Sequence, residues 1–277
     1  MSDTRPQSAY VLSAIIAILA IVASVGGLAG NLYRDNTWAT AGWLGNDLVT
    51  LAVAVPLLVV ALILAVRGSQ RAQLVWLAMV GYMLYNYAFY LFAAAFNRFF
   101  LIYVALFTLA IFALIFGLSK VDVNGISRQF RARTPVRWIA AFMLFFAVLL
   151  GGMWIAQALG SAVTGQVPQV VVDSGHPTSV VFALDLSLLV PGMVLGATWL
   201  WRRDPWGYVL GTMVNVKAVT YALALIGMSA YAARAGVPGA WDLAPLWAFL
   251  GAGNLIASAL LLGNMRSAEN RREAEKR

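Results

Sequence analysis

Asp185 and Lys217 are the two residues whose types and positions could support chemistry. Each lies inside a long apolar segment, and a short basic turn, Arg202 to Pro205, joins the two segments. Placing a charged residue at the middle of a membrane helix costs about 2.5–3.5 kcal/mol, so such residues usually pair, line water or take part in chemistry. We therefore treat this pair as the candidate centre of the protein.

The two side chains are predicted to lie at the same depth in a membrane. Asp185 is seven residues past Thr178, or roughly 10 Å into the membrane. Lys217 is twelve residues past Pro205 on the opposite side, which leaves about 12 Å of a 30 Å hydrocarbon core above it. Three interpretations stay open: a buried salt bridge between two helices, a ligand or proton site in an outward-facing cavity, and a lysine that snorkels without a partner.

Further polar residues are predicted to share the outer half of the membrane and to complete a ligand-binding pocket. They are Asp47, Asn86, Tyr87, Asn215 and Tyr221.

His176 stands just before Pro177, about one turn above Asp185. Either His176 or Asp185 could act as a general base at the mouth of such a pocket. A single histidine in an external loop is, however, more often solvated or caps a helix.

The composition indicates an all-α membrane protein. Hydrophobic residues make up 62% of the chain and charged residues 11%, whereas a soluble domain has about 25% charged residues. The absence of cysteine and the single histidine exclude disulfides, thiolate catalysis, Cys-based metal sites and paired-His haem ligation. No GxSxG, GxGxxG, Walker or HExxH pattern is present, and we expect neither a metal nor a cofactor.

Eight apolar runs are long enough to span a membrane as a helix bundle. They are residues 11–29, 48–66, 74–96, 99–118, 138–159, 180–201, 206–232 and 243–263. The chain is predicted to form one transmembrane domain, residues 1–277, that ends in a charged cytoplasmic tail, residues 266–277.

Basic residues are distributed unequally between the two sides of this topology. One side has fifteen: Arg5, Arg67, Arg71, Lys120, Arg128, Arg131, Arg133, Arg137, Arg202, Arg203, Arg266, Arg271, Arg272, Lys276 and Arg277. The other side has three: Arg34, Arg98 and Arg234. The positive-inside rule places the richer side, with both termini, in the cytoplasm of a bacterial inner membrane. This rule also accounts for the net charge of +8 without a nucleic-acid partner, and the expected partners are membrane lipids and a small ligand.

A weak internal repeat predicts two parallel half-repeats of four helices, residues 1–119 and 137–265. Pro56 lies eleven residues before Arg67, as Pro191 does before Arg202. Placing Trp76 on Trp206 also aligns Gly81 with Gly211, Met83 with Met213, Ala88 with Ala218 and Tyr87 with Lys217. Such a duplication would resemble parallel-repeat transporters.

Several segments together resemble an uncharacterised family of polytopic membrane proteins from GC-rich bacteria such as actinobacteria. These segments are YNYAFYLFAAAFNRFFLIYVALF, HPTSVVFALDLSLLVP, DPWGYVL and NVKAVTY. The resemblance covers most of the chain and implies a polytopic fold, but no function.

Four functions are compatible with this pattern. The leading hypothesis is a transporter-like or receptor-like protein that binds a small anionic or zwitterionic solute, or a lipid headgroup, near Asp185 and Lys217. The second is an intramembrane enzyme acting on lipid-linked substrates, with His176 or Asp185 as base and Lys217 holding a phosphate. The third is an assembly subunit held by a buried ion pair. The fourth is a retinal Schiff base on Lys217 with Asp185 as counter-ion, although Met213 stands where microbial rhodopsins would place an acid.

Overall fold

The structure is an all-helical bundle with eight helices long and apolar enough to cross a membrane. It is a computed structural model that describes residues 6–266, so most of the predicted charged tail lies outside the described residues. The spans are α1 (Gln7–Ala29), α2–η1–α3 (Thr37–Val66), α4 (Gln70–Ala93), α5 (Phe100–Ser119), α7 (Val136–Thr164), α9–η2–α10 (Val180–Trp201), α11 (Pro205–Arg234) and α12 (Ala244–Gly263). The predicted fold class and number of spans are confirmed.

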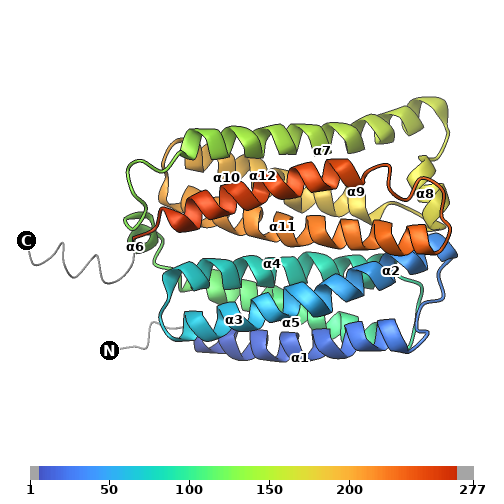
Figure 1. Cartoon of the computed structure of the whole chain (residues 1–277), viewed down its shortest axis with the longest axis horizontal. Helices are drawn as coiled ribbons and strands as arrows, with labels where there is room; N and C mark the ends of the chain where they lie inside the picture. Colours follow the sequence, from blue (N-terminus) through green and yellow to red (C-terminus); the bar gives the residue numbers. More distant parts are fainter. Residues whose placement is uncertain (1–5, 267–277) are drawn as a thin grey trace, which may run out of the picture.

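The helices run along the long axis of the molecule, and the start of α1 and the end of α12 lie at the same end of it (Figure 1). The short helix α6 (Val123–Ser127) lies at this end, and α8 (Gln169–Ser174) lies at the opposite end. We call these two ends the terminal end and the α8 end.

The second span begins eleven residues earlier than predicted, at Thr37 instead of Leu48. Asn36 caps this helix, because its side-chain oxygen accepts a hydrogen bond from the backbone N–H of Ala39 at 2.9 Å. Small and aromatic residues then pack this extension against α11. Asp47, expected at the head of the span, therefore lies well inside it.

The two spans that contain a proline in their middle, Pro56 or Pro191, have a wide π-helical turn that ends two residues before this proline. The turn η1 covers Thr50–Ala54 and precedes α3 (Val55–Val66), while η2 covers Asp185–Leu189 and precedes α10 (Val190–Trp201). A proline inside a helix removes one backbone donor and clashes with the carbonyl four residues earlier, and a wider turn relieves this conflict. Such turns are also frequent at functional sites.

The two halves of the chain keep one constant spacing of 135 residues across this region. It separates the starts of η1 and η2 (Thr50 and Asp185) and the helix caps Ser69 and Asp204. On this spacing Tyr82 corresponds to Lys217, and Trp76 corresponds to Gly211 instead of Trp206. The helix boundaries thus favour an alignment shifted by five residues from the one that places Trp76 on Trp206. The duplication itself stays a prediction.

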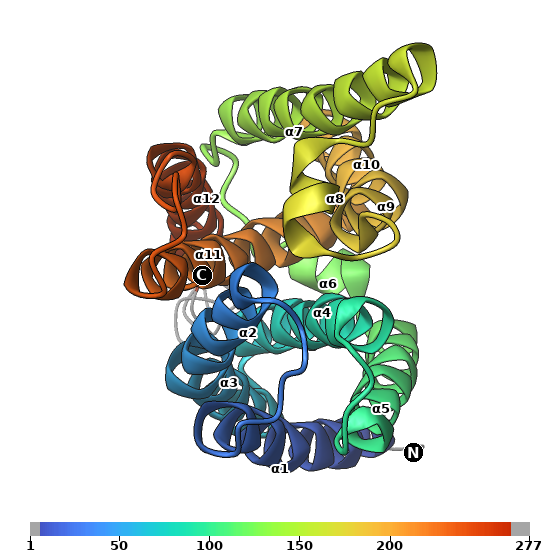
Figure 2. The same cartoon turned by 90° about the vertical axis from the view of Figure 1, so that its right-hand side faces the viewer.

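The helices form two groups of four that differ in closure. In the first group α5 packs along α1 and closes a ring, whereas in the second group α12 packs on α11 and touches α7 at few residues. Figure 2 shows α7 and α12 well separated on one side of the molecule. Helix α11 joins the groups because it contacts α2 and α4 as well as α10 and α12.

Helices α2 and α11 approach each other at Gly45 and Gly227. A Cβ atom added at Gly45 would lie 2.3 Å from the backbone oxygen of Gly227. Small residues that allow such close approach are typical of membrane helix interfaces.

We expect Gly45→Ala to lower the free energy of unfolding by about 1–3 kcal/mol, because the new methyl group forces the two backbones apart. Reversible denaturant unfolding in a fixed detergent measures the change. Gly152→Ala on α7 is the matched control, since an added Cβ there meets no atom within 4 Å. Equal stability of the two variants would contradict the close contact.

Candidate functional site

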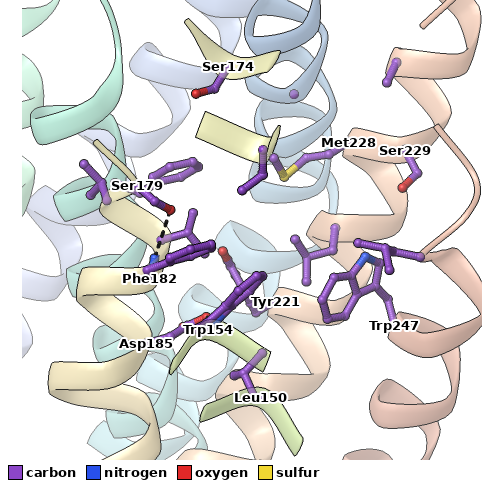
Figure 3. Close-up of a pocket in the computed structure, with 18 of the residues that line it drawn as sticks. Leu150, Trp154, Ser174, Ser179, Phe182, Asp185, Tyr221, Met228, Ser229 and Trp247 are labelled. Carbon is purple, nitrogen blue, oxygen red and sulfur yellow. Dashed lines mark hydrogen bonds between the residues drawn. The ribbon is translucent and has the colours of Figure 1, made fainter. Parts of the chain in front are cut away.

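A cavity of about 550 Å³ lies between the helices of the second group, is bounded by part of the first group, and reaches the α8 end. Residues of α7, α9, α11 and α12 form most of its walls, and residues of α2 and α4 complete them. Aromatic side chains such as Trp154, Phe182 and Trp247 contribute much of the surface. Its volume falls within the range of small-molecule sites, which are mainly apolar with a few polar groups. In Figure 3, Asp185, Trp154 and Tyr221 lie close together, with Ser174 above them and Trp247 to one side.

Asp185 is buried at the first position of η2, and both of its carboxylate oxygens accept hydrogen bonds. The hydroxyl of Tyr85 donates to Oδ1 at 2.6 Å, and the indole N–H of Trp154 donates to Oδ2 at 2.8 Å. The side chains of three different spans therefore meet at this carboxylate. Neither donor is Lys217.

Lys217 lies against aromatic rings instead of a carboxylate. Its Nζ is 3.5 Å from the centre of the Tyr85 ring and 4.4 Å from that of Tyr221. A cation over an aromatic face is attracted by the ring quadrupole, so both contacts are favourable. Tyr85 thus contacts both charged residues, through its hydroxyl on Asp185 and through its ring on Lys217.

The predicted salt bridge between Asp185 and Lys217 is not formed in the structure. Within residues 6–266, the one ion pair closer than 4.0 Å joins His176 to Asp35. Lys217 does not snorkel to the membrane surface either, because a snorkelling side chain would expose its ammonium group to water and Lys217 is only 7% exposed. Its Nζ is buried without any hydrogen-bond partner among the described residues, and Lys217 lines the cavity.

His176 lies where the cavity reaches the α8 end. Its Nε2 is 3.2 Å from Oδ1 of Asp35, and both oxygens of Asp35 also accept the backbone N–H of Ala95. Nearby, the Asn36 amide donates to the backbone oxygen of Asp173 at 2.8 Å. These contacts link the connection before α2 in the first group to the connection around α8 in the second.

Four of the predicted pocket residues do not line this cavity. Asp47, Asn86 and Tyr87 face the interior of the first helix group, and Asn215 donates to the backbone oxygen of Gly211 at 2.7 Å. Successive residues of an α-helix point about 100° apart, so Asn86 and Tyr87 point in other directions than Tyr85, which contacts Asp185 and Lys217. The prediction that all these residues line one pocket, which was based on their shared depth, is therefore wrong. Depth in the membrane does not specify the direction of a side chain.

The residues of the first group form a separate polar cluster. Asp47 accepts hydrogen bonds from the hydroxyls of Tyr33 and Tyr90, the latter at 3.0 Å. Asn86 accepts one from the Asn46 amide at 2.7 Å. Burial raises the pKa of Tyr33, which lies in the connection before α2, so its hydroxyl stays protonated as the donor to Asp47.

Sequence reasoning missed Tyr85, Trp154 and Asn254. Tyr85 belongs to an aromatic stripe on α4 that is typical of packing, and no residue pattern links Trp154 to Asp185. The Asn254 amide on α12 donates to the Leu250 carbonyl of its own helix at 2.7 Å. Its Oδ1 is buried, has no partner among the described residues, and belongs to a residue that lines the cavity.

The fold and this site define a multi-pass membrane protein with a cavity that contains a buried ammonium group. Comparisons with protein-family models, with curated proteins and with solved structures found no match. Within residues 6–266, no group of three His, Cys, Asp or Glu residues is placed to hold a metal ion.

We expect Tyr85→Phe to lower the free energy of unfolding by about 1–3 kcal/mol, because Asp185 loses one of its two donors while Lys217 keeps an aromatic ring. Denaturant unfolding against Tyr231→Phe, a change near the α8 end of α11, measures this effect. If the two variants were equally stable, the Tyr85 hydroxyl would have no role in holding Asp185.

Proposed function

We propose that this protein binds a small anionic or zwitterionic solute, or a lipid headgroup, in the cavity near Lys217, and acts as a carrier or receptor in a bacterial cytoplasmic membrane. The observation that carries the proposal is the Lys217 ammonium group, which is buried, lines the cavity and has no hydrogen-bond acceptor among the described residues.

A buried ammonium group without an acceptor is costly, because a charge removed from water needs a compensating partner. Asp185 supplies only part of this compensation, because its carboxylate oxygens and the Lys217 Nζ are not within 4.0 Å of each other. An anionic group that entered the cavity would give Lys217 the acceptor that it lacks. Asn254 could add an acceptor for a donor group on a zwitterionic ligand.

The orientation of the cavity follows from the distribution of charge. The terminal end carries most of the basic residues, and the positive-inside rule assigns that end, with both termini, to the cytoplasm. The cavity reaches the opposite, α8 end through residues such as His176 and Asp242. Under this assignment the cavity opens outward.

We expect Lys217→Met to weaken binding of an anionic probe at least tenfold, equivalent to about 1.4 kcal/mol, while membrane insertion stays normal. The probe is dansylglycine, a carboxylate with an aromatic body, excited by energy transfer from Trp154 and Trp247 of the cavity wall. Lys120→Met, at the end of α5 far from the cavity, is the matched control. Unchanged binding by Lys217→Met would exclude the proposed site.

A second candidate function, an intramembrane enzyme acting on lipid-linked substrates, is favoured by the contact of His176 with Asp35. A carboxylate that orients a histidine is a common arrangement for a general base, and His176 lines the same cavity as Lys217. Asp185 is a poorer base than His176, because both of its oxygens already accept hydrogen bonds.

Turnover separates the two functions. If the protein is an enzyme, purified protein incubated with a panel of polyprenyl-phosphate-linked sugars and phospholipids gives product, and His176→Ala abolishes product formation. If it is a carrier or receptor, no product forms and His176→Ala still binds dansylglycine.

A further inference from the structure

Helices α7 and α12 of the second group make few contacts with each other. The two helices meet where the ring of Phe142 lies over Gly253, and where Phe145 and Phe249 stand edge to face with ring centres 6.4 Å apart. In the first group α5 packs along α1, so the equivalent side is closed. The separation of α7 and α12 is visible in Figure 2.

We call the region between α7 and α12 on the α8 side of these contacts the opening. It lies beside the cavity. Trp154 is nine residues beyond Phe145 on α7, or about 14 Å closer to the α8 end. Trp154 and Trp247 line the cavity from α7 and α12, respectively. Phe145 and Phe249 are about half exposed, as expected for side chains of a membrane span that contact lipid. On this side, the cavity is therefore bounded by two helices that make few contacts with each other.

We propose that the ligand is a single-chain lipid anion whose head reaches Lys217 in the cavity, while its acyl chain leaves between α7 and α12 into the bilayer. This inference rests on the proposed function and names its ligand class. The head is a carboxylate or a phosphate monoester, as in a fatty acid or a lysophosphatidate.

The position of Lys217 favours an amphiphile over a fully water-soluble anion. Ala232, which lines the cavity near the α8 end, lies fifteen residues from Lys217 along α11, or about 22 Å. The wall along this distance is largely aromatic and aliphatic, which suits a chain better than a hydrated ion. A lipid that enters sideways keeps its chain in hydrocarbon throughout and exposes only its head to the polar groups.

The size and polar groups of the cavity limit the ligand to a small head with one chain. A volume of about 550 Å³ is that of a site for a drug-sized molecule. Lys217 supplies the donor for the anionic oxygen, and the free Oδ1 of Asn254 can accept a hydroxyl such as that of a lysolipid glycerol. The carboxylate of Asp185 keeps its own two donors and need not rearrange.

Photolabelling in lipid nanodiscs tests the position of the chain. The probe is palmitate with a diazirine at the end of its chain, and peptide mass spectrometry maps the labelled residues. We expect label on α7 and α12 beside the opening, around Leu149 and Phe249, and we expect Lys217→Met to remove most of it. Lys120→Met should label like the unmodified protein.

The methyl ester of the same probe is the matched ligand control, because it keeps the chain and lacks the charge. It should give only the background labelling of annular lipid, equal in the unmodified protein and in Lys217→Met. Label on the connections at the α8 end, residues 165–179 and 235–243, would overturn the proposed orientation. Label beside the opening that Lys217→Met leaves unchanged would show ordinary lipid contact and would also overturn it.

Competition against dansylglycine separates this inference from the proposed function. We expect palmitate to displace dansylglycine at a concentration at least about a hundredfold lower than butyrate does, because each buried methylene group adds affinity. Lysophosphatidate in parallel distinguishes a phosphate head from a carboxylate. Equal potency of butyrate and palmitate would overturn the lipid ligand and leave the binding site standing. Failure of dansylglycine itself to bind would remove the proposed function.

The same opening could instead seat a second copy of the chain. Cross-linked dimers joined through α7 and α12, together with loss of palmitate labelling, would identify that occupant and overturn the lipid proposal. A monomer in nanodiscs that is labelled as described supports it.

Discussion

The hydrogen bonds from Tyr85 and Trp154 to the Asp185 carboxylate are the interaction on which the rest of the site depends. They bring together α4, α7 and η2, and they give each oxygen of a buried carboxylate a hydrogen-bond donor other than the lysine. Because Tyr85 donates to Asp185, its ring is held at the position where Lys217 rests. The ammonium group is thereby held over an aromatic ring, and it donates no hydrogen bond to any described residue.

The sequence predicted the class, the number of spans and the shared depth of Asp185 and Lys217, because long apolar runs and intramembrane charges leave few alternatives. It could not predict which side chains point into one cavity. Asp47 and Asn86 lie at a suitable depth but turn into the first helix group. Trp154 carries no signal of its own, since an indole in a membrane helix is ordinary until a carboxylate is found beside it.

The start of the second span shows a different limit of sequence reasoning. The segment before Leu48 contains Asn46 and Asp47, which make it too polar to count as part of an apolar run. In the structure these side chains are buried and bonded to Asn86, Tyr33 and Tyr90, so the helix extends through them. Tertiary partners thus lengthen a helix that hydropathy alone ends early.

The two π-helical turns have a consequence for how each half can change. On the common spacing, Thr50 and Tyr82 occupy the places of Asp185 and Lys217, and their oxygens are 3.2 Å apart in a neutral contact. A wide turn holds one residue more than an α-turn, so it rotates the helix before it relative to the helix after it. The side chain of the first residue in the turn, Thr50 or Asp185, therefore points in a different direction than it would in a regular α-helix continued from the proline-containing segment. At one end of this spacing a wide turn thus begins with a neutral hydrogen-bonded residue, and at the other it begins with a carboxylate that lies beside, but does not pair with, an ammonium group.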